Sequence, residues 1–163
     1  MSKKVLSREQ KRILDVNRNR VTEALRVVED ILRFSEKSTR FALQVKKLRH
    51  DVFKVFEDVE RETGEKLIFY RDSSRDRGRL DDYDAINKNT SRLPVILHKN
   101  LRRACEGLRV CEEILKILPR ENLPLSFKSL RFRSYDVEKK LELRLGRTEK
   151  RPGKSRKSDL KIT

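Results

Sequence analysis

The stretch Ile13–Leu32, ILDVNRNRVTEALRVVEDIL, recurs as Ile96–Leu115, ILHKNLRRACEGLRVCEEIL. The copies align without a gap at a constant offset of 83 residues, and 11 of the 20 aligned positions are identical. Internal repetition of this kind indicates a chain built from two similar halves. The identical polar positions are Asn17/Asn100, Arg20/Arg103, Glu23/Glu106, Arg26/Arg109 and Glu29/Glu112. Because packing alone would preserve only the apolar residues, this polar set marks candidate functional positions.

Apolar residues recur at helical spacing in both copies and in the segment that follows each copy. We predict helices over about residues 7–34, 38–63, 91–118 and 126–145. Ser7 and Gln10 form a capping-box signature at the start of the first helix, and Gly64 and Gly146 are stop signals for the second and fourth. The sequence therefore predicts an all-α fold, a bundle of two αα-hairpins in pseudo-twofold arrangement.

The expected domain organisation follows from these elements. Residues 1–145 form a single all-helical domain that contains the repeat units 7–63 and 91–145. Residues 146–163 form a basic tail with almost nothing to bury, and we expect this tail to be disordered. The least regular segment, residues 65–90, joins the two halves and has room for short helices. A connection of this length inside a compact domain is usually functional or mobile.

The net charge of +16 implies anionic partners, which include nucleotides, phosphorylated metabolites, nucleic acid and anionic membrane surfaces. No apolar run reaches the length of a membrane span, and the N-terminus has no apolar signal-peptide core. Cys105 and Cys111 lie six residues apart on a predicted helix and point in different directions, so they cannot bridge. We therefore expect a reduced, cytoplasmic protein. Two histidines and no CxxC pair argue against a zinc site.

Helical projection at about 100° per residue places Asn17 and Arg20 inside the apolar arc of the first helix, with Glu23 at its edge. The constant offset gives the same placement to Asn100, Arg103 and Glu106 on the third helix. Each half is thus expected to turn an Asn-x-x-Arg-x-x-Glu ladder towards the bundle interior. The projection places Arg26 and Glu29 on the outward side, at ion-pair spacing.

Arg49 also projects inwards on the second helix, and Arg131 borders the apolar stripe of the fourth. A buried arginine is costly unless it meets an anion or several acceptors. The inward arginines outnumber the edge glutamates, so a bound anion would balance the charge. The alternative is that inward Arg and Glu side chains pair across neighbouring helices and fix their register without any ligand.

The central connection carries a second candidate site, Arg71-Asp72-Ser73-Ser74-Arg75-Asp76-Arg77-Gly78. Asp72 and Asp76 are candidate ligands of Mg²⁺, and Arg71 and Arg75 are candidate phosphate contacts, which is the division of labour that phosphoryl transfer needs. The alternative is a charged solvent loop. Because the chain has no GxxxxGK[ST], GxGxxG or GxSxG motif, any nucleotide chemistry needs a site built from helices.

The ordered motifs resemble one known family, the helical domain that is often fused ahead of thiamine-phosphate synthase and also occurs alone as a hydroxymethylpyrimidine phosphate kinase. The resemblance covers about residues 10–142. The motifs that carry it are Asn17-x-x-Arg20-x-x-Glu23-Ala24-Leu25-Arg26-Val27-x-Glu29-Asp30, Leu48-Arg49-His50, Arg71-Asp72-Ser73-x-x-Asp76-x-Gly78, Asn100-x-x-Arg103-x-x-Glu106-Gly107-x-Arg109-x-x-Glu112-Glu113 and Leu130-Arg131-Phe132-x-x-Tyr135. The chain departs from the family at Arg77, where an apolar residue is expected. It also differs from the fused form in its basic tail, and we expect no synthase barrel with it.

The resemblance implies an ATP-dependent phosphorylation of 4-amino-5-hydroxymethyl-2-methylpyrimidine phosphate to the diphosphate, in thiamine biosynthesis, with Mg²⁺ as cofactor. The implied catalytic residues are Arg20, Arg103, Asp72 and Asp76. The implied phosphate-binding residues are Asn17, Arg49, Arg71, Asn100 and Arg131, and the implied Mg²⁺ ligands are Glu23 and Glu106. Further candidate partners are a separate thiamine-phosphate synthase and a second copy of the chain, and no membrane is expected among them.

Two other functions fit the same residues. The first is a non-catalytic RNA-binding or assembly protein that uses the basic helices and tail, because basic surfaces bind RNA weakly through phosphates. Basic residues are not interleaved with aromatic platforms, which argues against this function. The second is a regulatory domain that binds the pyrimidine phosphate and docks on a thiamine-phosphate synthase without chemistry.

Overall fold

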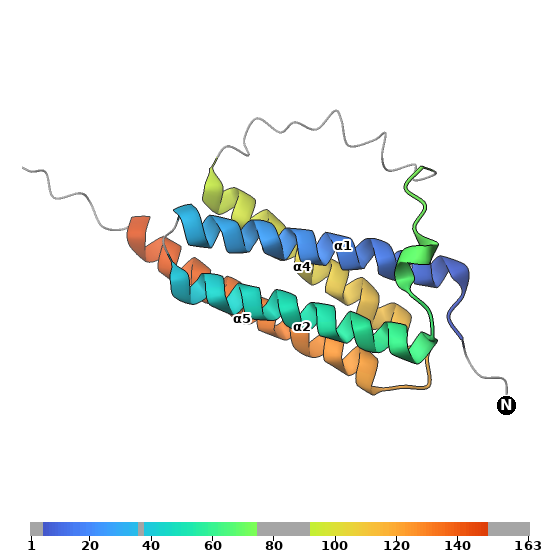
Figure 1. Ribbon diagram of the computed structural model, residues 1–163. Coiled ribbons are helices and arrows are strands. Elements are labelled where there is room, and N and C mark those ends of the chain that lie inside the picture. The colour runs from blue at the N-terminus through green and yellow to red at the C-terminus, as the bar shows by residue number, and fades with distance from the viewer. Residues whose placement is uncertain (1–4, 36–37, 75–91, 150–163) are drawn as a thin grey trace, which may run out of the picture.

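The structure, a computed structural model, describes residues 5–35, 38–74 and 92–149 (Figure 1). Its long helices are α1 (Arg8–Asp30), α2 (Thr39–Thr63), α4 (Leu93–Leu115) and α5 (Asn122–Glu149). A π-helical turn, η1 (Ile31–Ser35), continues α1, and a short 3-10 helix, η2 (Leu67–Tyr70), follows α2. The predicted all-α bundle is confirmed. The predicted short helices in the connection are represented by η2, and residues 75–91 lie outside the described part.

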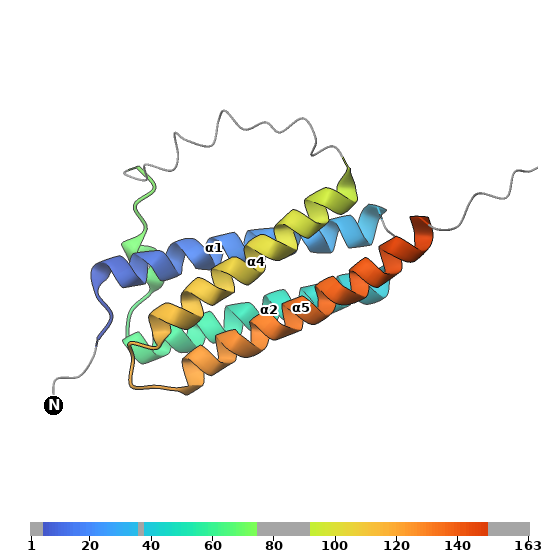
Figure 2. The same ribbon diagram turned by 180° about the vertical axis from the view of Figure 1, so that it is seen from behind.

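The helices form two layers, with α1 and α4 in one layer and α2 and α5 in the other (Figures 1 and 2). Helices α1 and α2 form one antiparallel hairpin, and α4 and α5 form the second. The apolar core lies between the layers and includes fully buried Leu14, Leu48, Leu108 and Phe127. Phe56 of α2 meets Phe127 of α5 edge to face, with ring centroids 5.0 Å apart. The two halves therefore share one core.

The closest approach of α1 and α4 depends on Gly107. A Cβ atom at this position would lie 2.6 Å from Cγ2 of Val21 and 3.4 Å from Oδ1 of Asn17. Glycine removes that clash and lets the two backbones cross closely. Asn17 and Asn100 are buried, and each donates from Nδ2 to the carbonyl four residues earlier, at 2.8 Å in both helices. Equal geometry at equivalent positions shows that the sequence repeat is a structural repeat.

The helix ends follow most of their sequence signals. Ser7 Oγ accepts from Gln10 N at 3.3 Å while Gln10 Oε1 accepts from Ser7 N at 2.8 Å, which confirms the capping box. Gly64 ends α2 in the left-handed conformation, with φ +72°. The predicted end of the fourth helix at Gly146 is wrong, because α5 continues to Glu149. A single glycine costs a helix only about 1 kcal/mol and does not by itself end one.

Two equivalent ion pairs show which residues of α2 and α5 correspond to each other. Arg49 Nε lies 3.0 Å from Glu29 Oε2, and Arg131 Nη2 lies 2.9 Å from Glu112 Oε2. The second helices of the two halves therefore correspond at an offset of 82, so that Phe53 is equivalent to Tyr135.

Within the described residues, no helix is long and apolar enough to cross a membrane.

Candidate functional site

The structure corrects the predicted orientation of the repeated ladder. Asn17 and Asn100 are buried, as predicted. The four other members of the ladder are exposed, and they are Arg20, Glu23, Arg103 and Glu106. The ladder therefore presents its charged residues on the surface and only its asparagines to the interior.

The projection failed because apolar residues on the surface shifted the apparent centre of the buried arc. Ile13 is 38% exposed and Val27 is 37% exposed, yet both widen the apolar arc on the side of Arg20. The true buried face is centred on Leu14, Val21, Leu25 and Val28, which are all fully buried. Exposed apolar side chains are common in folded proteins, so their presence does not define a buried face.

The predicted outward position of Glu29 is also wrong. Glu29 and its copy Glu112 are buried, and each carboxylate meets one arginine from its own helix and one from the partner helix of its hairpin. The four contacts are Arg26–Glu29 at 3.8 Å, Arg49–Glu29 at 3.0 Å, Arg109–Glu112 at 3.1 Å and Arg131–Glu112 at 2.9 Å. Pairing across neighbouring helices is thus the arrangement that holds for Arg49 and Arg131.

The Glu112 cluster is the more buried of the two. Arg131 also donates from Nη1 to the hydroxyl of Tyr135 at 3.3 Å. The hydrogen bond to Tyr135, together with the carboxylate of Glu112, raises the pKa of Arg131. The guanidinium is therefore permanently charged and neutralised within the bundle, which gives it a structural role.

We define the outer face as the side of the α1/α4 layer that is turned away from α2 and α5. Its residues repeat every seven positions, on one side of each helix. They are Ile13, Arg20 and Val27 on α1, and Ile96, Arg103 and Val110 on α4. Because Gly107 touches both Asn17 and Val21, the turn of α4 that carries Arg103 lies against the turn of α1 that carries Arg20.

The two arginines of the outer face differ from most other repeated charges. Within the described residues, neither Arg20 nor Arg103 has a carboxylate at ion-pair distance. Both are exposed, so they stabilise no buried group. Neither packing nor ion pairing therefore explains why both halves carry an arginine at this position. An anion bound where α1 and α4 meet would explain it.

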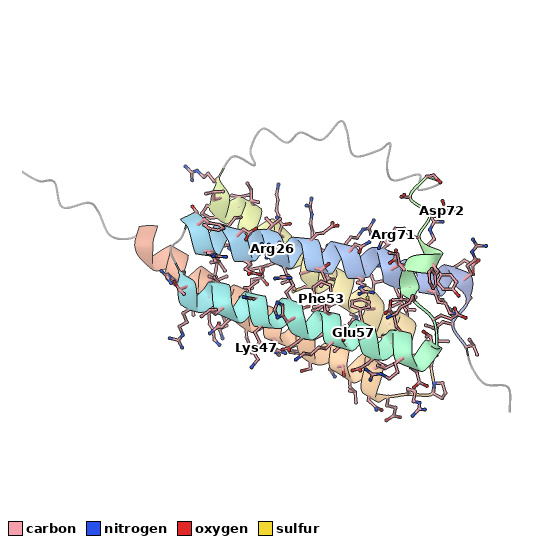
Figure 3. The ribbon with its side chains drawn as sticks, in the orientation of Figure 1. Arg26, Lys47, Phe53, Glu57, Arg71 and Asp72 are labelled. Atoms are coloured by element: carbon pink, nitrogen blue, oxygen red, sulfur yellow. The ribbon has the colours of Figure 1, made fainter. Side chains whose placement is uncertain are left out.

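A groove of about 410 Å³ lies along α1, and all of its described lining residues come from this helix. It is lined by Glu9, Arg12, Ile13, Val16, Asn17 and Arg20. Arg12 donates from Nη2 to the carbonyl of Asp72 at 2.8 Å, so the start of the central connection is anchored at the groove. Figure 3 shows Arg71 and Asp72 on the segment that follows η2. The structure thus brings Asn17, Arg20 and Asp72 of the predicted site to one region.

Arg71 joins the same region through a side chain that the sequence analysis missed. Its Nε and Nη2 atoms donate to the two carboxylate oxygens of Asp15 at 2.9 and 3.0 Å. Asp15 is 1% exposed. The hydrogen bonds that Arg71 donates to Asp15 raise the pKa of Arg71, and the charges of Asp15 and Glu23 add to this effect. Glu23 is therefore close enough to belong to the same electrostatic environment.

A second anchor also escaped the sequence analysis. Lys11 is buried and its Nζ lies 2.6 Å from Glu65 and 3.2 Å from the hydroxyl of Tyr70, which also donates to Glu65. These contacts fix η2 against the start of α1. The only signal in the sequence is charge complementarity between distant segments, which does not identify partners. Asp76, Arg75 and Arg77 of the predicted loop lie outside the described residues.

Comparison with known proteins assigns a family to most of the chain. The sequence profile of the ThiD2 family matches residues 12–140. The thiamine-phosphate synthase of Thermosynechococcus vestitus is 32% identical over 133 residues, which are 82% of this chain and 35% of the relative. Those of Nostoc punctiforme and Gloeobacter violaceus are 31% and 33% identical, over 80% and 78% of this chain and 34% and 35% of the relatives. The chain thus spans about a third of the length of these curated relatives. No solved structure matches the chain.

Proposed function

The chain belongs to the ThiD2 family, and on that premise we propose that it transfers the γ-phosphoryl group of ATP to 4-amino-5-hydroxymethyl-2-methylpyrimidine phosphate. The product is the diphosphate of the hydroxymethylpyrimidine. The relatives named thiamine-phosphate synthase link the chain to thiamine biosynthesis. The kinase step itself rests on the motif resemblance and on the charge pattern of the outer face.

The observation that carries the proposal is the unpaired state of the repeated arginines within the described residues. Arg20 and Arg103 come from equivalent positions of the two halves and lie on adjacent turns of α1 and α4. A phosphoryl transfer between two phosphorylated reactants brings several negative charges together. Arginine pairs with phosphate in bidentate geometry, and one arginine from each half suits one phosphate group from each reactant.

Arg71 and Asp72 support the same site from the central connection. The bidentate pair with Asp15 uses two of the five N–H donors of Arg71, which leaves donors for a phosphate. Because Asp15 is almost fully buried, it fixes the guanidinium of Arg71 beside α1. A positioned cation that needs no reorganisation during the reaction is the usual source of electrostatic stabilisation.

The residues of this region fit a Mg²⁺ ion held mainly by substrate. Magnesium in phosphoryl-transfer sites is usually bound by one or two carboxylates together with phosphate oxygens and water. The described residues contain no group of three or more possible metal ligands, so the proposed ion would take most of its ligands from phosphate oxygens and water. Glu23 is the best-placed carboxylate, since it is exposed, lacks an ion pair among the described residues and influences Arg71. Glu106 fits less well, because its carboxylate lies 3.8 Å from Arg102.

When bound, Mg²⁺ would neutralise charge on the phosphate oxygens, and the chain's own residues would do the positioning. The acceptor is an ionised phosphate, so no general base is required. Arg20, Arg103 and Arg71 would hold the reacting groups in line, and Asn17 would contribute a polar side chain at the floor of the groove. Positioning and charge neutralisation are then the main catalytic effects.

The direct test is a turnover assay with the purified chain, ATP, Mg²⁺ and the pyrimidine phosphate. We expect equal amounts of ADP and pyrimidine diphosphate, resolved by anion-exchange chromatography. The matched control replaces the pyrimidine phosphate with the unphosphorylated alcohol and should give no diphosphate. Binding of the pyrimidine phosphate without turnover, in protein with a helical circular dichroism spectrum, would refute the kinase proposal and favour the regulatory domain.

A further inference from the structure

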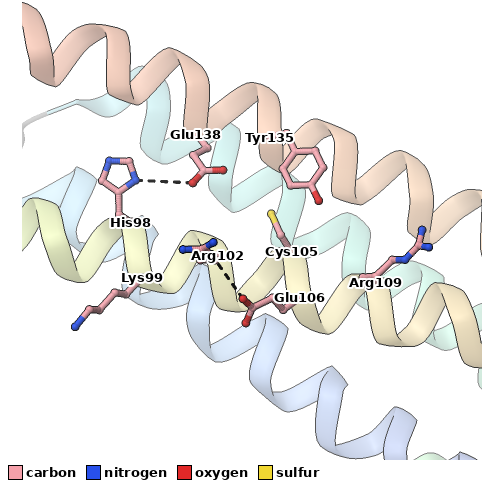
Figure 4. A pocket seen from close by; sticks show the side chains of 8 residues that line it. All are labelled: His98, Lys99, Arg102, Cys105, Glu106, Arg109, Tyr135 and Glu138. Carbon is pink, nitrogen blue, oxygen red and sulfur yellow. Dashed lines mark ion pairs between the residues drawn. The ribbon is translucent and has the colours of Figure 1, made fainter.

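A larger groove lies on the other flank of α4, between α4 and α5. Its volume is about 750 Å³, within the range of about 300–1,000 Å³ that is common for small-molecule sites. Its lining residues are His98, Lys99, Arg102, Cys105, Glu106, Arg109, Tyr135 and Glu138 (Figure 4). The arginines of the proposed transfer site, Arg20 and Arg103, do not line it. Within the described residues, Glu106, the less suitable of the two candidate Mg²⁺ ligands, is the one member of the proposed transfer site that does line this α4–α5 groove.

The groove exists because the two halves differ at equivalent positions. In the first half, Arg18 extends over the rings of Phe53 and Phe56 at 6.0 and 5.9 Å and pairs with Glu60 at 2.9 Å. This cation fills the space between α1 and α2. In the second half the equivalent of Arg18 is Leu101, which is fully buried in the core. The equivalent of Phe56 is Glu138, a smaller and polar side chain.

The same substitutions give the groove an aromatic wall and a neutral floor. The ring of Tyr135 lies beside the sulfur of Cys105 (Figure 4). Its hydroxyl accepts a hydrogen bond from Nη1 of Arg131. Burial raises the pKa of the Cys105 thiol to about 11, so the thiol is uncharged at neutral pH. A fixed aromatic ring beside a neutral, polarisable sulfur gives an apolar surface on which a flat ring can pack.

The rim of the groove provides charge for an anion. Lys99 has no carboxylate at ion-pair distance among the described residues, and Arg102 lies 3.8 Å from Glu106 with both side chains largely exposed. Exposed pairs of this kind contribute little and are easily exchanged for a stronger partner. At the opposite end, Glu138 approaches the ring of His98 at 3.9 Å. Cations and hydrogen-bond acceptors are thus both available around the aromatic wall.

We propose that the α4–α5 groove binds a phosphorylated heteroaromatic compound, with its ring against Tyr135 and Cys105 and its phosphates on Lys99 and Arg102. Glu138 accepts hydrogen bonds from amino groups of the ring. The inference goes beyond the kinase proposal, because it concerns a second groove whose lining contains neither Arg20 nor Arg103. A ligand in this groove would contact α5 through Tyr135 and α4 through Arg102.

The test uses isothermal titration calorimetry with ADP as a heteroaromatic diphosphate probe, and with adenosine and inorganic pyrophosphate as its two parts. The protein is the full chain carrying Arg20→Ala and Arg103→Ala, which removes the arginines of the proposed transfer site. We expect ADP to bind this protein at one site per chain, and we expect both parts alone to bind at least about tenfold more weakly. Failure of ADP to bind this protein would overturn the proposal, whether or not the wild-type chain is a kinase.

The groove itself is tested by adding Tyr135→Ala, or Lys99→Ala with Arg102→Ala, to that protein. Each change should weaken ADP binding by about tenfold or more. The matched control is Lys47→Ala with Lys140→Ala, which removes two cations from a smaller groove between α2 and α5 and should leave binding unchanged. Thermal unfolding followed by circular dichroism establishes that each variant is folded. ADP binding that survives all the groove variants, or that pyrophosphate alone reproduces, would show the assignment to be wrong.

Discussion

Replacement of Glu112 by glutamine tests whether the buried ion pairs hold the bundle together. The Glu112 side chain is 5% exposed, while that of its neighbour Glu113 is 44% exposed. Arg131 donates to Glu112 from Nε and Nη2 at 3.0 and 2.9 Å, and Arg109 approaches it at 3.1 Å. Glu112→Gln keeps the shape of the side chain and removes only the charge. It therefore leaves the guanidinium of Arg131 buried without a carboxylate.

The magnitude follows from this geometry. Breaking a fully buried ion pair by removing one partner costs about 3–5 kcal/mol. In the Glu112→Gln protein, Arg131 keeps its hydrogen bond to the hydroxyl of Tyr135, and Arg109 remains partly exposed to solvent. We therefore expect Glu112→Gln to lower the free energy of unfolding by about 2–3 kcal/mol. For a chain of this size that corresponds to a fall in Tm of about 5–10 °C. Glu113→Gln should cost at most about 0.5 kcal/mol, because its pairs with Arg109 and Lys116 are exposed.

The assay is urea unfolding followed by circular dichroism at a helix wavelength, with the midpoint and slope fitted for both variants. A second comparison pairs Glu112→Leu with Arg131→Met, which removes both charges and should recover much of the loss. Equal stability of Glu112→Gln and Glu113→Gln would refute the structural role of the pair. A stable Glu112→Gln variant that has lost phosphate binding would instead assign Arg131 to a ligand site.

Three further predictions concern packing, pH and thiol reactivity. A Cβ added at position 107 would lie 2.6 Å from Cγ2 of Val21, so Gly107→Val should lower the free energy of unfolding in urea by about 2 kcal/mol or more. Adding Val21→Ala should recover part of this loss. Burial acts to raise the pKa of Glu60, but the hydrogen bonds that Lys66 and the Leu67 amide donate to its carboxylate lower this pKa overall. The destabilisation caused by Glu60→Gln should therefore have its full size at pH values above the ordinary pKa of 4.5, and it should become smaller as the pH falls below 4.5. A constant difference from pH 7 to pH 3 would contradict that interpretation. Cys105 and Cys111 should resist a disulfide exchange reagent at pH 8 in the folded protein and both react in guanidinium chloride, since burial raises their pKa values.

The repeat and the helical periodicity were enough to predict the fold. Two copies at a constant offset indicate two equivalent hairpins, and the apolar spacing within them predicts helices that bury one side. Asn17 and Asn100 were placed correctly because they lie near the centre of that side. These features depend on local sequence, which a single chain displays directly.

The orientation of the charged residues depended on information that is not local. Ile13 lies on the surface and shifted the apparent buried arc towards Arg20. Glu29 is buried because Arg49 approaches it from another helix, and Asp15 because Arg71 returns to it from the central connection. A helical projection uses only the residues of one helix and does not include partners from other segments. It therefore places charged residues on the outward side and apolar residues on the inward side. The same limitation explains why the α4–α5 groove, which depends on differences between the halves, had no sequence signal.

The most direct test of the central claim compares three arginine variants in the phosphotransfer assay. Arg20 and Arg103 occupy the outer face, whereas Arg40 is an equally exposed arginine at the start of α2 with no carboxylate at ion-pair distance among the described residues. Our account predicts that Arg20→Ala and Arg103→Ala each lower kcat/KM by about a hundredfold or more without loss of stability, and that Arg40→Ala leaves it unchanged. Full activity of the Arg20→Ala and Arg103→Ala proteins, or equal losses in all three variants, would contradict it.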